Sequence, residues 1–194
     1  MCKLITITGT TAVGKDTIFD KILKYADYKP IISDTTRPMR VGEVQDKTYH
    51  FISHQEFINR KINNKYIENR EYKTEFGYWY YGINKNEIDI ESDNTYLVIV
   101  DYQGLIKLRD YCNKNDIKIK SFYITSNVKT RILRSLNRDK IDNEKSYEIC
   151  RRILKDRDEI ETFCEKDNEL IKLKNEKDED IMNCVFEIIK ECEE

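Results

Sequence analysis

The stretch "GTTAVGKDT" at positions 9–17 has the spacing of a phosphate-binding loop, G-x-x-x-x-G-K. In such a loop, successive backbone N–H groups curl around phosphate oxygens, and the lysine reaches the β- and γ-phosphates. A β-rich run precedes this stretch and an amphipathic helical pattern follows it, which is the context that the motif requires. We therefore predict a nucleoside triphosphate site here. Its expected ligands are Gly9, Thr10, Thr11, Ala12, Val13, Gly14, Lys15, Asp16 and Thr17.

Asp16 stands where such loops usually carry the Ser or Thr that binds Mg²⁺. A carboxylate is also a hard oxygen ligand that suits Mg²⁺. Thr17 is a poor replacement, because the next residue on a helix points about 100° away. We predict that Asp16 binds Mg²⁺ directly or through water. The alternative is that it only favours the first turn of the helix, where the helix dipole stabilises a negative charge.

A second set of phosphate-binding side chains follows in "TTRPMRVGEVQDKTYHF" (35–51). Arg37 and Arg40 lie three residues apart, Pro38 stiffens the chain between them, and Tyr49 follows in a predicted strand. Two guanidinium groups and a phenol can clamp a phosphate. The segment therefore predicts a site for a second, phosphorylated substrate. An isolated pair of this kind would instead be two solvated loop arginines.

The elements that must position these side chains alternate between strands and helices, which indicates an α/β fold with a parallel sheet. Strands are predicted at 3–8, 30–33, 95–101, 117–125 and 169–174, and helices at 15–26, 54–63, 127–138, 145–165 and 178–192. The run 95–101 is apolar nearly throughout, which suits the middle of a parallel sheet. Neither Gly nor Pro occurs after Gly104, so we expect mostly long helices with short strands in the rest of the chain.

The composition predicts a soluble globular protein, since 39% of its 194 residues are hydrophobic and 36% are charged, and its length predicts one domain, with or without inserted lobes. The net charge of −2 argues against a nucleic-acid or membrane partner. Six cysteines form no C-x-x-C pair, so a zinc site is not expected. The first apolar run is too short for a signal peptide, and we expect a cytoplasmic protein.

Motifs along nearly the whole chain resemble those of guanylate kinases. Segment 35–51 resembles the family pattern T-T-R-x-x-R-x-G-E-x-x-G-x-x-Y-x-F. The similarity continues through "YIE" (66–68), "YYG" (80–82), "VIVDYQG" (98–104), "EICRRI" (148–153), "KDRDEI" (155–160) and "LIKLKN" (170–175). The resemblance implies a P-loop NTPase-type three-layer fold with a central parallel sheet. It also implies a core (1–32, 95–134 and 160–194), an inserted GMP-binding lobe (33–94) and a helical lid (135–159).

By this resemblance, the chain would transfer the γ-phosphoryl group of ATP to GMP or dGMP with Mg²⁺ as cofactor. The resemblance implies catalytic roles for Lys15, Arg37, Arg138 and Arg152, and contacts to ATP from Arg134 and Asn175. It implies that GMP is bound by Ser33, Arg37, Arg40, Tyr49, Glu68, Tyr81 and Asp101. The carboxylates would accept hydrogen bonds from guanine N1–H and N2–H₂. The expected partners are these nucleotides, bound by a monomer or homodimer.

Three positions depart from the family pattern. Asp46 replaces a Gly, Ile83 replaces a Ser or Thr at the guanine edge, and Ile99 replaces an acidic residue. The phosphate-binding positions are kept, whereas the base-reading positions are partly changed. The first alternative is therefore a related kinase acting on another (deoxy)nucleoside monophosphate or on a ribose phosphate. The second is a non-catalytic, protein-binding relative, which typically lacks the loop lysine and lid arginines that this chain retains.

Overall fold

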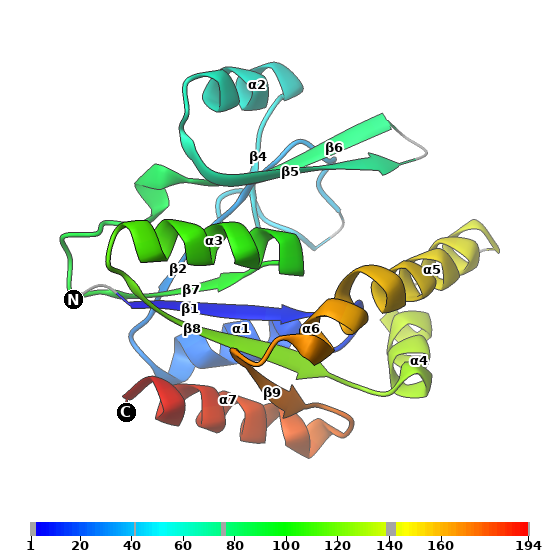
Figure 1. Ribbon diagram of the computed structural model, residues 1–194. Helices are drawn as coiled ribbons and strands as arrows, with labels where there is room; N and C mark the ends of the chain where they lie inside the picture. The colour runs from blue at the N-terminus through cyan, green and yellow to red at the C-terminus, as the bar shows by residue number, and fades with distance from the viewer. Residues whose placement is uncertain (1–2, 41, 75–76, 139–142, 194) are drawn as a thin grey trace.

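The computed structural model describes residues 3–40, 42–74, 77–138 and 143–193, which fold around two β-sheets (Figure 1). The larger sheet is parallel, with the order β2-β7-β1-β8-β9. Its strands are β1 (Lys3–Gly9), β2 (Lys29–Pro30), β7 (Thr95–Ile99), β8 (Lys118–Thr125) and β9 (Leu170–Lys174). The carboxyl ends of β1 and β8 point to the same edge, which is where α/β folds bind their ligands (Figure 1).

Helices cover both faces of the larger sheet, giving three layers (Figure 1). Helix α3 (Tyr102–Lys114) lies on one face, and α1 (Lys15–Tyr25) and α7 (Asp178–Glu193) lie on the other. Alternate residues of β1 supply the two cores: Leu4 packs into the cluster that includes α3, and Ile5 into the cluster that includes α1 and α7. This alternation follows from the two-residue period of a strand.

The smaller sheet is inserted between β2 and β7, with the order β4-β3-β6-β5. Its elements are β3 (Asp34–Thr35), β4 (His50–Phe51), helix α2 (His54–Ile62), β5 (Tyr66–Thr74), β6 (Gly77–Asn84) and a 3-10 turn (Lys85–Glu87). Strands β5 and β6 form a long antiparallel hairpin. This hairpin lies over α3, on the far side of α3 from the larger sheet (Figure 1).

A run of helices follows β8 (Figure 1). It contains α4 (Val128–Arg138), α5 (Asn143–Asp156), a π-helical turn (Arg157–Glu161) and α6 (Thr162–Lys166). We call the part from α4 to the π-helical turn the arm. None of the helices in the described ranges is long and apolar enough to cross a membrane.

The predicted fold class and most elements are confirmed, including the helix-rich segment after Gly104. The strand predicted at 30–33 is shorter, because the N–H of Ile32 donates to the Glu87 carboxylate instead of continuing the ladder. Helix α3 was not predicted, although Asp101 caps it through Gly104 N at 2.8 Å. The helix predicted at 145–165 is interrupted by the π-helical turn.

Candidate active site

The loop Gly9–Lys15 joins β1 to α1 at the carboxyl edge of the larger sheet. Gly14 has a φ of +94°, and a Cβ at this position would lie 2.6 Å from Nδ2 of Asn175, so only glycine fits. Nζ of Lys15 donates to the carbonyl oxygens of Gly9 at 2.7 Å and Thr10 at 2.8 Å. The ammonium group therefore lies against the loop, where it can meet a phosphate.

Asn175 braces this loop from the end of β9. Its side chain is fully buried, and Nδ2 donates to the carbonyl of Val13 at 2.7 Å. The backbone carbonyl oxygen of Asn175 accepts a hydrogen bond from Nη1 of Arg134 on α4 at 3.0 Å. The two residues expected to contact ATP outside the loop thus lie beside it. The Asn175 amide, however, is committed to holding the loop backbone.

A buried ion-pair network, which sequence reasoning missed, ties the same loop to the arm. Arg131 on α4 is fully buried and donates through Nε to the carbonyl of Thr11 at 3.0 Å. Oδ2 of Asp156 accepts from the N–H of Thr11 at 2.6 Å and from Nη2 of Arg131 at 2.8 Å. Glu161 also pairs with Arg131. One signal was available, since Arg131 and Arg134 are three residues apart and so share a helix face.

Asp16 is exposed on the first turn of α1, as is Thr17. Among the described residues, no group of three or more His, Cys, Asp or Glu side chains could hold a metal ion. A single carboxylate beside a phosphate loop nevertheless fits Mg²⁺, which proteins usually hold through one or two carboxylates and the substrate phosphates. Asp16 is the residue that would hold this ion.

Arg37 lies in the loop after β3 and is only 5% exposed. Its Nη1 and Nη2 atoms lie 2.7 and 2.5 Å from the two carboxylate oxygens of Glu43. Its Cζ lies 5.0 Å from the centroid of the Tyr49 ring, within the range of a cation–π contact. Burial alone would lower the pKa of Arg37, but the ion pair with Glu43 outweighs it, and the pKa is raised. The guanidinium group is therefore charged and fixed in direction.

Arg40 lies within electrostatic range of both Arg37 and Arg152. Partial desolvation of the exposed Arg40 side chain, followed by the positive charges of Arg37 and Arg152, lowers the pKa of Arg40. Arg152 reaches this cluster from α5, where its Nε donates to Glu148 at 2.7 Å. We call these three residues the arginine cluster. An anion between their side chains would relieve the repulsion, which makes the cluster a candidate phosphate site.

Arg138 is the last residue of α4, and its side chain lies outside the described part of the chain.

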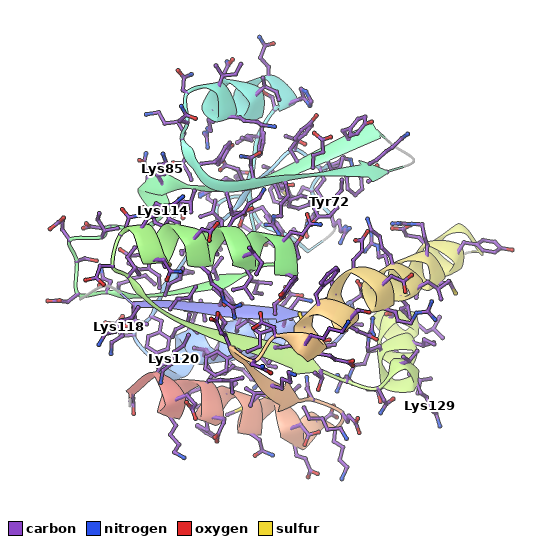
Figure 2. The ribbon with its side chains drawn as sticks, viewed as in Figure 1. Tyr72, Lys85, Lys114, Lys118, Lys120 and Lys129 are labelled. Carbon is purple, nitrogen blue, oxygen red and sulfur yellow. The ribbon has the colours of Figure 1, made fainter. Side chains whose placement is uncertain are left out.

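Tyrosine rings connect the arginine cluster to the β5–β6 hairpin. The ring centroids of Tyr49 and Tyr81 are 5.9 Å apart, and those of Tyr72 and Tyr81 are 5.6 Å apart. Nζ of Lys155 on α5 lies 5.5 Å from the centroid of the Tyr72 ring. Figure 2 shows Tyr72 below the hairpin, on the side toward the arm. Burial, followed by the charge of Tyr81, raises the pKa of Tyr49, and Asp16 adds to this shift, so Asp16 at the start of α1 lies within electrostatic range of Tyr49.

The two carboxylates predicted to read guanine are bridged by an arginine that the sequence analysis did not single out. Nη2 of Arg70 donates to Oε1 of Glu68 at 3.0 Å, and Nη1 lies 2.8 Å from Oδ1 of Asp101. Nε of Arg70 also lies 3.0 Å from Oε2 of Glu68, but not in hydrogen-bond alignment. Burial raises the pKa of Glu68 despite the charge of Arg70. Strand periodicity was an available signal, because residues 68 and 70 share one face of β5.

Two other positions at this end of the site are buried. Ser33 is 6% exposed, and its carbonyl accepts from the N–H of His50 at 3.0 Å. Ile83 is fully buried in the cluster that contains Ile31 and Val98. The isoleucine therefore belongs to the hydrophobic core and provides no hydrogen-bonding group.

A polar cavity of about 470 Å³ lies in the smaller sheet, and none of the predicted site residues lines it. His50 is on its wall, with Nδ1 2.6 Å from Asp46 and Nε2 3.3 Å from Glu87. Burial lowers the pKa of His50, but the hydrogen bond to Asp46 and the charge of Glu87 raise it more, so the net shift is upward. This cluster braces the segment that carries Arg37.

Comparisons with known proteins agree with this geometry. The family model described as guanylate kinase matches residues 1–192. The guanylate kinase of Clostridium perfringens (strain 13 / Type A) is 34% identical over 110 residues, which is 55% of this chain and 49% of that protein. The guanylate kinase of Blochmanniella floridana is 36% identical over 109 residues, covering 54% of this chain and 50% of that protein. The chain thus spans about half the length of these curated relatives.

Two solved structures share the fold. The guanylate kinase from Anaplasma phagocytophilum has a TM-score of 0.67 and 21% identity, covering 97% of this chain and 85% of that chain. A gluconokinase from Sinorhizobium meliloti 1021 has a TM-score of 0.53 and 11% identity, covering 97% of this chain and 90% of that chain. The fold is therefore that of P-loop kinases. Because the family model covers nearly every residue, this chain belongs to the guanylate kinase family.

Proposed function

We propose that this chain transfers the γ-phosphoryl group of ATP to GMP or dGMP, giving ADP and GDP or dGDP. The observation that carries the proposal is that Arg37 lies against the ring of Tyr49, which is within electrostatic range of Asp16, directly after the Gly9–Lys15 loop. A second phosphate site next to a triphosphate loop is what phosphoryl transfer requires. In this proposal, residues 33–94 bind the acceptor and residues 135–159 act as the lid. The protein acts in the cytoplasm as a monomer or homodimer.

The donor is held by the loop. The backbone N–H groups of the loop other than that of Thr11, together with Nζ of Lys15, bind the triphosphate, and the buried network around Thr11 keeps the loop backbone in one conformation. Asp16 would hold Mg²⁺, which when bound would supply positive charge to the phosphate oxygens. The protein does little covalent work in such a reaction, because alignment and charge neutralisation supply most of the rate enhancement.

The acceptor phosphate is fixed by Arg37 and Arg40. The bidentate pair with Glu43 holds the Arg37 side chain, so little conformational entropy is lost when it binds the substrate. Arg152, and Arg138 by resemblance, neutralise the charge on the moving phosphoryl group. The contact between Lys155 and Tyr72 brings the arm against the hairpin, which helps to exclude water from the reaction.

The test is ADP release from Mg-ATP with a panel of GMP, dGMP, AMP, UMP, CMP and dTMP. We expect turnover with GMP and dGMP that exceeds turnover with the other four. Equal or greater turnover with another monophosphate would favour the related kinases that use a different acceptor. No turnover with any acceptor would contradict the proposal and favour a protein-binding role.

A ribose phosphate is the second candidate acceptor, because two observations at the base-reading end favour it. Ile83 offers no hydrogen bond, and Arg70 occupies both predicted guanine-reading carboxylates. Ribose 5-phosphate is therefore added to the panel.

A further inference from the structure

Arg70 spans two parts of the molecule. Its own strand β5 carries Glu68, whereas Asp101 belongs to the larger-sheet core, at the start of α3. Gly104, in the first turn of α3, leaves room for the guanidinium group, because a Cβ there would lie 3.1 Å from Cζ and Nη1 of Arg70. Lys107 of α3 reinforces this junction by donating to the carbonyl of Asn69 at 2.5 Å. Arg70 is therefore held between both carboxylates.

The polarity of this arrangement is opposite to what guanine needs. The edge of guanine presents N1–H and N2–H₂, which must meet hydrogen-bond acceptors. Here the acceptors Glu68 and Asp101 already face the N–H groups of Arg70. Nη1 and Nη2 each carry a second N–H beyond these pairs, so a guanine edge would meet donors as well as acceptors. Oxygen atoms of hydroxyl or carbonyl groups can accept from a guanidinium without this conflict.

The site remains within reach of a ligand bound at the arginine cluster. The Arg70 side chain is 9% exposed and the Asp101 side chain 21% exposed. Tyr49, whose ring lies under Arg37, is also within electrostatic range of Arg70. A ligand whose phosphate binds Arg37 can therefore extend toward Arg70.

We propose that Arg70 is a specificity-determining residue of the acceptor site: by neutralising Glu68 and Asp101, it weakens selection for guanine and admits phosphomonoesters that present hydroxyl or carbonyl oxygens. The inference rests on the proposed function only in placing the acceptor phosphate beside Arg37. It widens the acceptor class to include phosphate esters whose distal group accepts hydrogen bonds from Arg70. Guanine binds only by displacing Arg70 from at least one carboxylate.

Calorimetric titration of the full chain with GMP and with ribose 5-phosphate tests this directly, because binding is measured without turnover. In the wild-type protein we expect dissociation constants for the two ligands within about tenfold of each other, since the guanine base then adds at most about one useful hydrogen bond. GMP binding more than about a hundredfold tighter than that of ribose 5-phosphate would overturn the proposal. Failure of both GMP and ribose 5-phosphate to bind would also overturn it.

Arg70→Met keeps much of the aliphatic packing beside Gly104 but frees both carboxylates. We expect GMP binding to tighten about tenfold and ribose 5-phosphate binding to weaken or stay unchanged, because buried carboxylates without a partner gain most from the guanine edge. Arg70→Lys keeps the positive charge and should retain the wild-type ratio. Lys73→Met removes a charge from the opposite face of the same strand and is the matched control.

An unchanged ratio of the two dissociation constants in folded Arg70→Met would overturn the proposal, as would equal weakening of both ligands. If Arg70→Met does not fold, the wild-type ratio decides alone. Turnover is assayed separately, as ADP release from ATP in the presence of each acceptor. If the binding ratio shifts but no acceptor gives ADP release, the proposed kinase activity is contradicted and the role of Arg70 stays supported.

Discussion

The two ends of the proposed acceptor site are built in different ways. At the phosphate end, Arg37 is fixed by Glu43, and the Gly9–Lys15 loop is held by Asn175 and by Asp156. At the proposed base-reading end, recognition would depend on the side chains around Arg70. Phosphate binding would thus depend on the backbone of the Gly9–Lys15 loop and on the rigid Arg37–Glu43 ion pair. Base selection, in contrast, can change with one or two side chains.

This difference has a physical origin. A phosphate has the same charge and shape in every acceptor, so the groups that bind it are constrained by the reaction itself. The far end of the acceptor differs from one substrate to the next. Selectivity between two acceptors is the difference between their binding free energies. An added arginine can reverse that difference without disturbing the loop or the arginine cluster.

The largest expected effect is at the phosphate end. Lys15→Met should lower kcat/KM for ATP by about a thousandfold, because one preorganised positive charge at the transferred phosphate is lost. Steady-state ADP release measures it, with Lys24→Met on the same helix as the surface control. A loss below about tenfold would mean that the loop does not hold the reacting phosphates.

Ile83→Ser tests whether the base-reading end extends to residue 83. We expect a loss of about 3 kcal/mol in the free energy of unfolding, because a fully buried isoleucine is replaced by a smaller, polar side chain. Urea denaturation measures this loss, and Ile83→Val should cost only about 1 kcal/mol. GMP affinity should not increase. A serine variant that bound GMP more tightly at unchanged stability would place residue 83 in the pocket.

The phosphate end could be predicted from sequence because its signals are local. The glycines and Lys15 lie in one short loop, and Arg37, Arg40 and Tyr49 lie in one segment. The fold class was predictable for the same reason, since strands and helices alternate along the chain. Such patterns need only a few neighbouring residues.

The missed residues act over long sequence separations. Thr11 and Asp156 are 145 residues apart along the chain. Arg70 lies in β5 of the smaller sheet and reaches Asp101 at the start of α3. A charged residue in a helix or strand most often faces solvent, so neither Arg131 nor Arg70 gave a signal by type alone. Only the packing of the arm and the hairpin against the core brings these charges together.

Asp156→Asn tests how far the phosphate end depends on the buried network. The variant leaves the charge of Arg131 with Glu161 as its remaining partner, and we expect a loss of about 2 kcal/mol in the free energy of unfolding. Urea denaturation measures it, and Asp158→Asn on the exposed π-helical turn is the control. The KM for ATP should rise modestly, because Asn can still accept from the N–H of Thr11. Equal stability of the two variants would show that the loop is held without this ion pair.

The smallest expected effect is the pH dependence of the brace behind Arg37. His50 has a raised pKa in the folded state, so its contribution to stability is fully present below the ordinary histidine pKa of about 6.5 and is lost as pH rises through the folded value. Urea denaturation at several pH values between about 5.5 and 8.5 should therefore show a decline in wild-type stability that His50→Gln lacks. His54→Gln, which removes the other histidine, serves as the control and should keep the decline. The effect should stay below about 1 kcal/mol, because Asp46 is exposed. If the free energy of unfolding of His50→Gln declines by the same amount over this pH range, His50 does not cause the decline. The segment that carries Arg37 would then be held independently of this histidine.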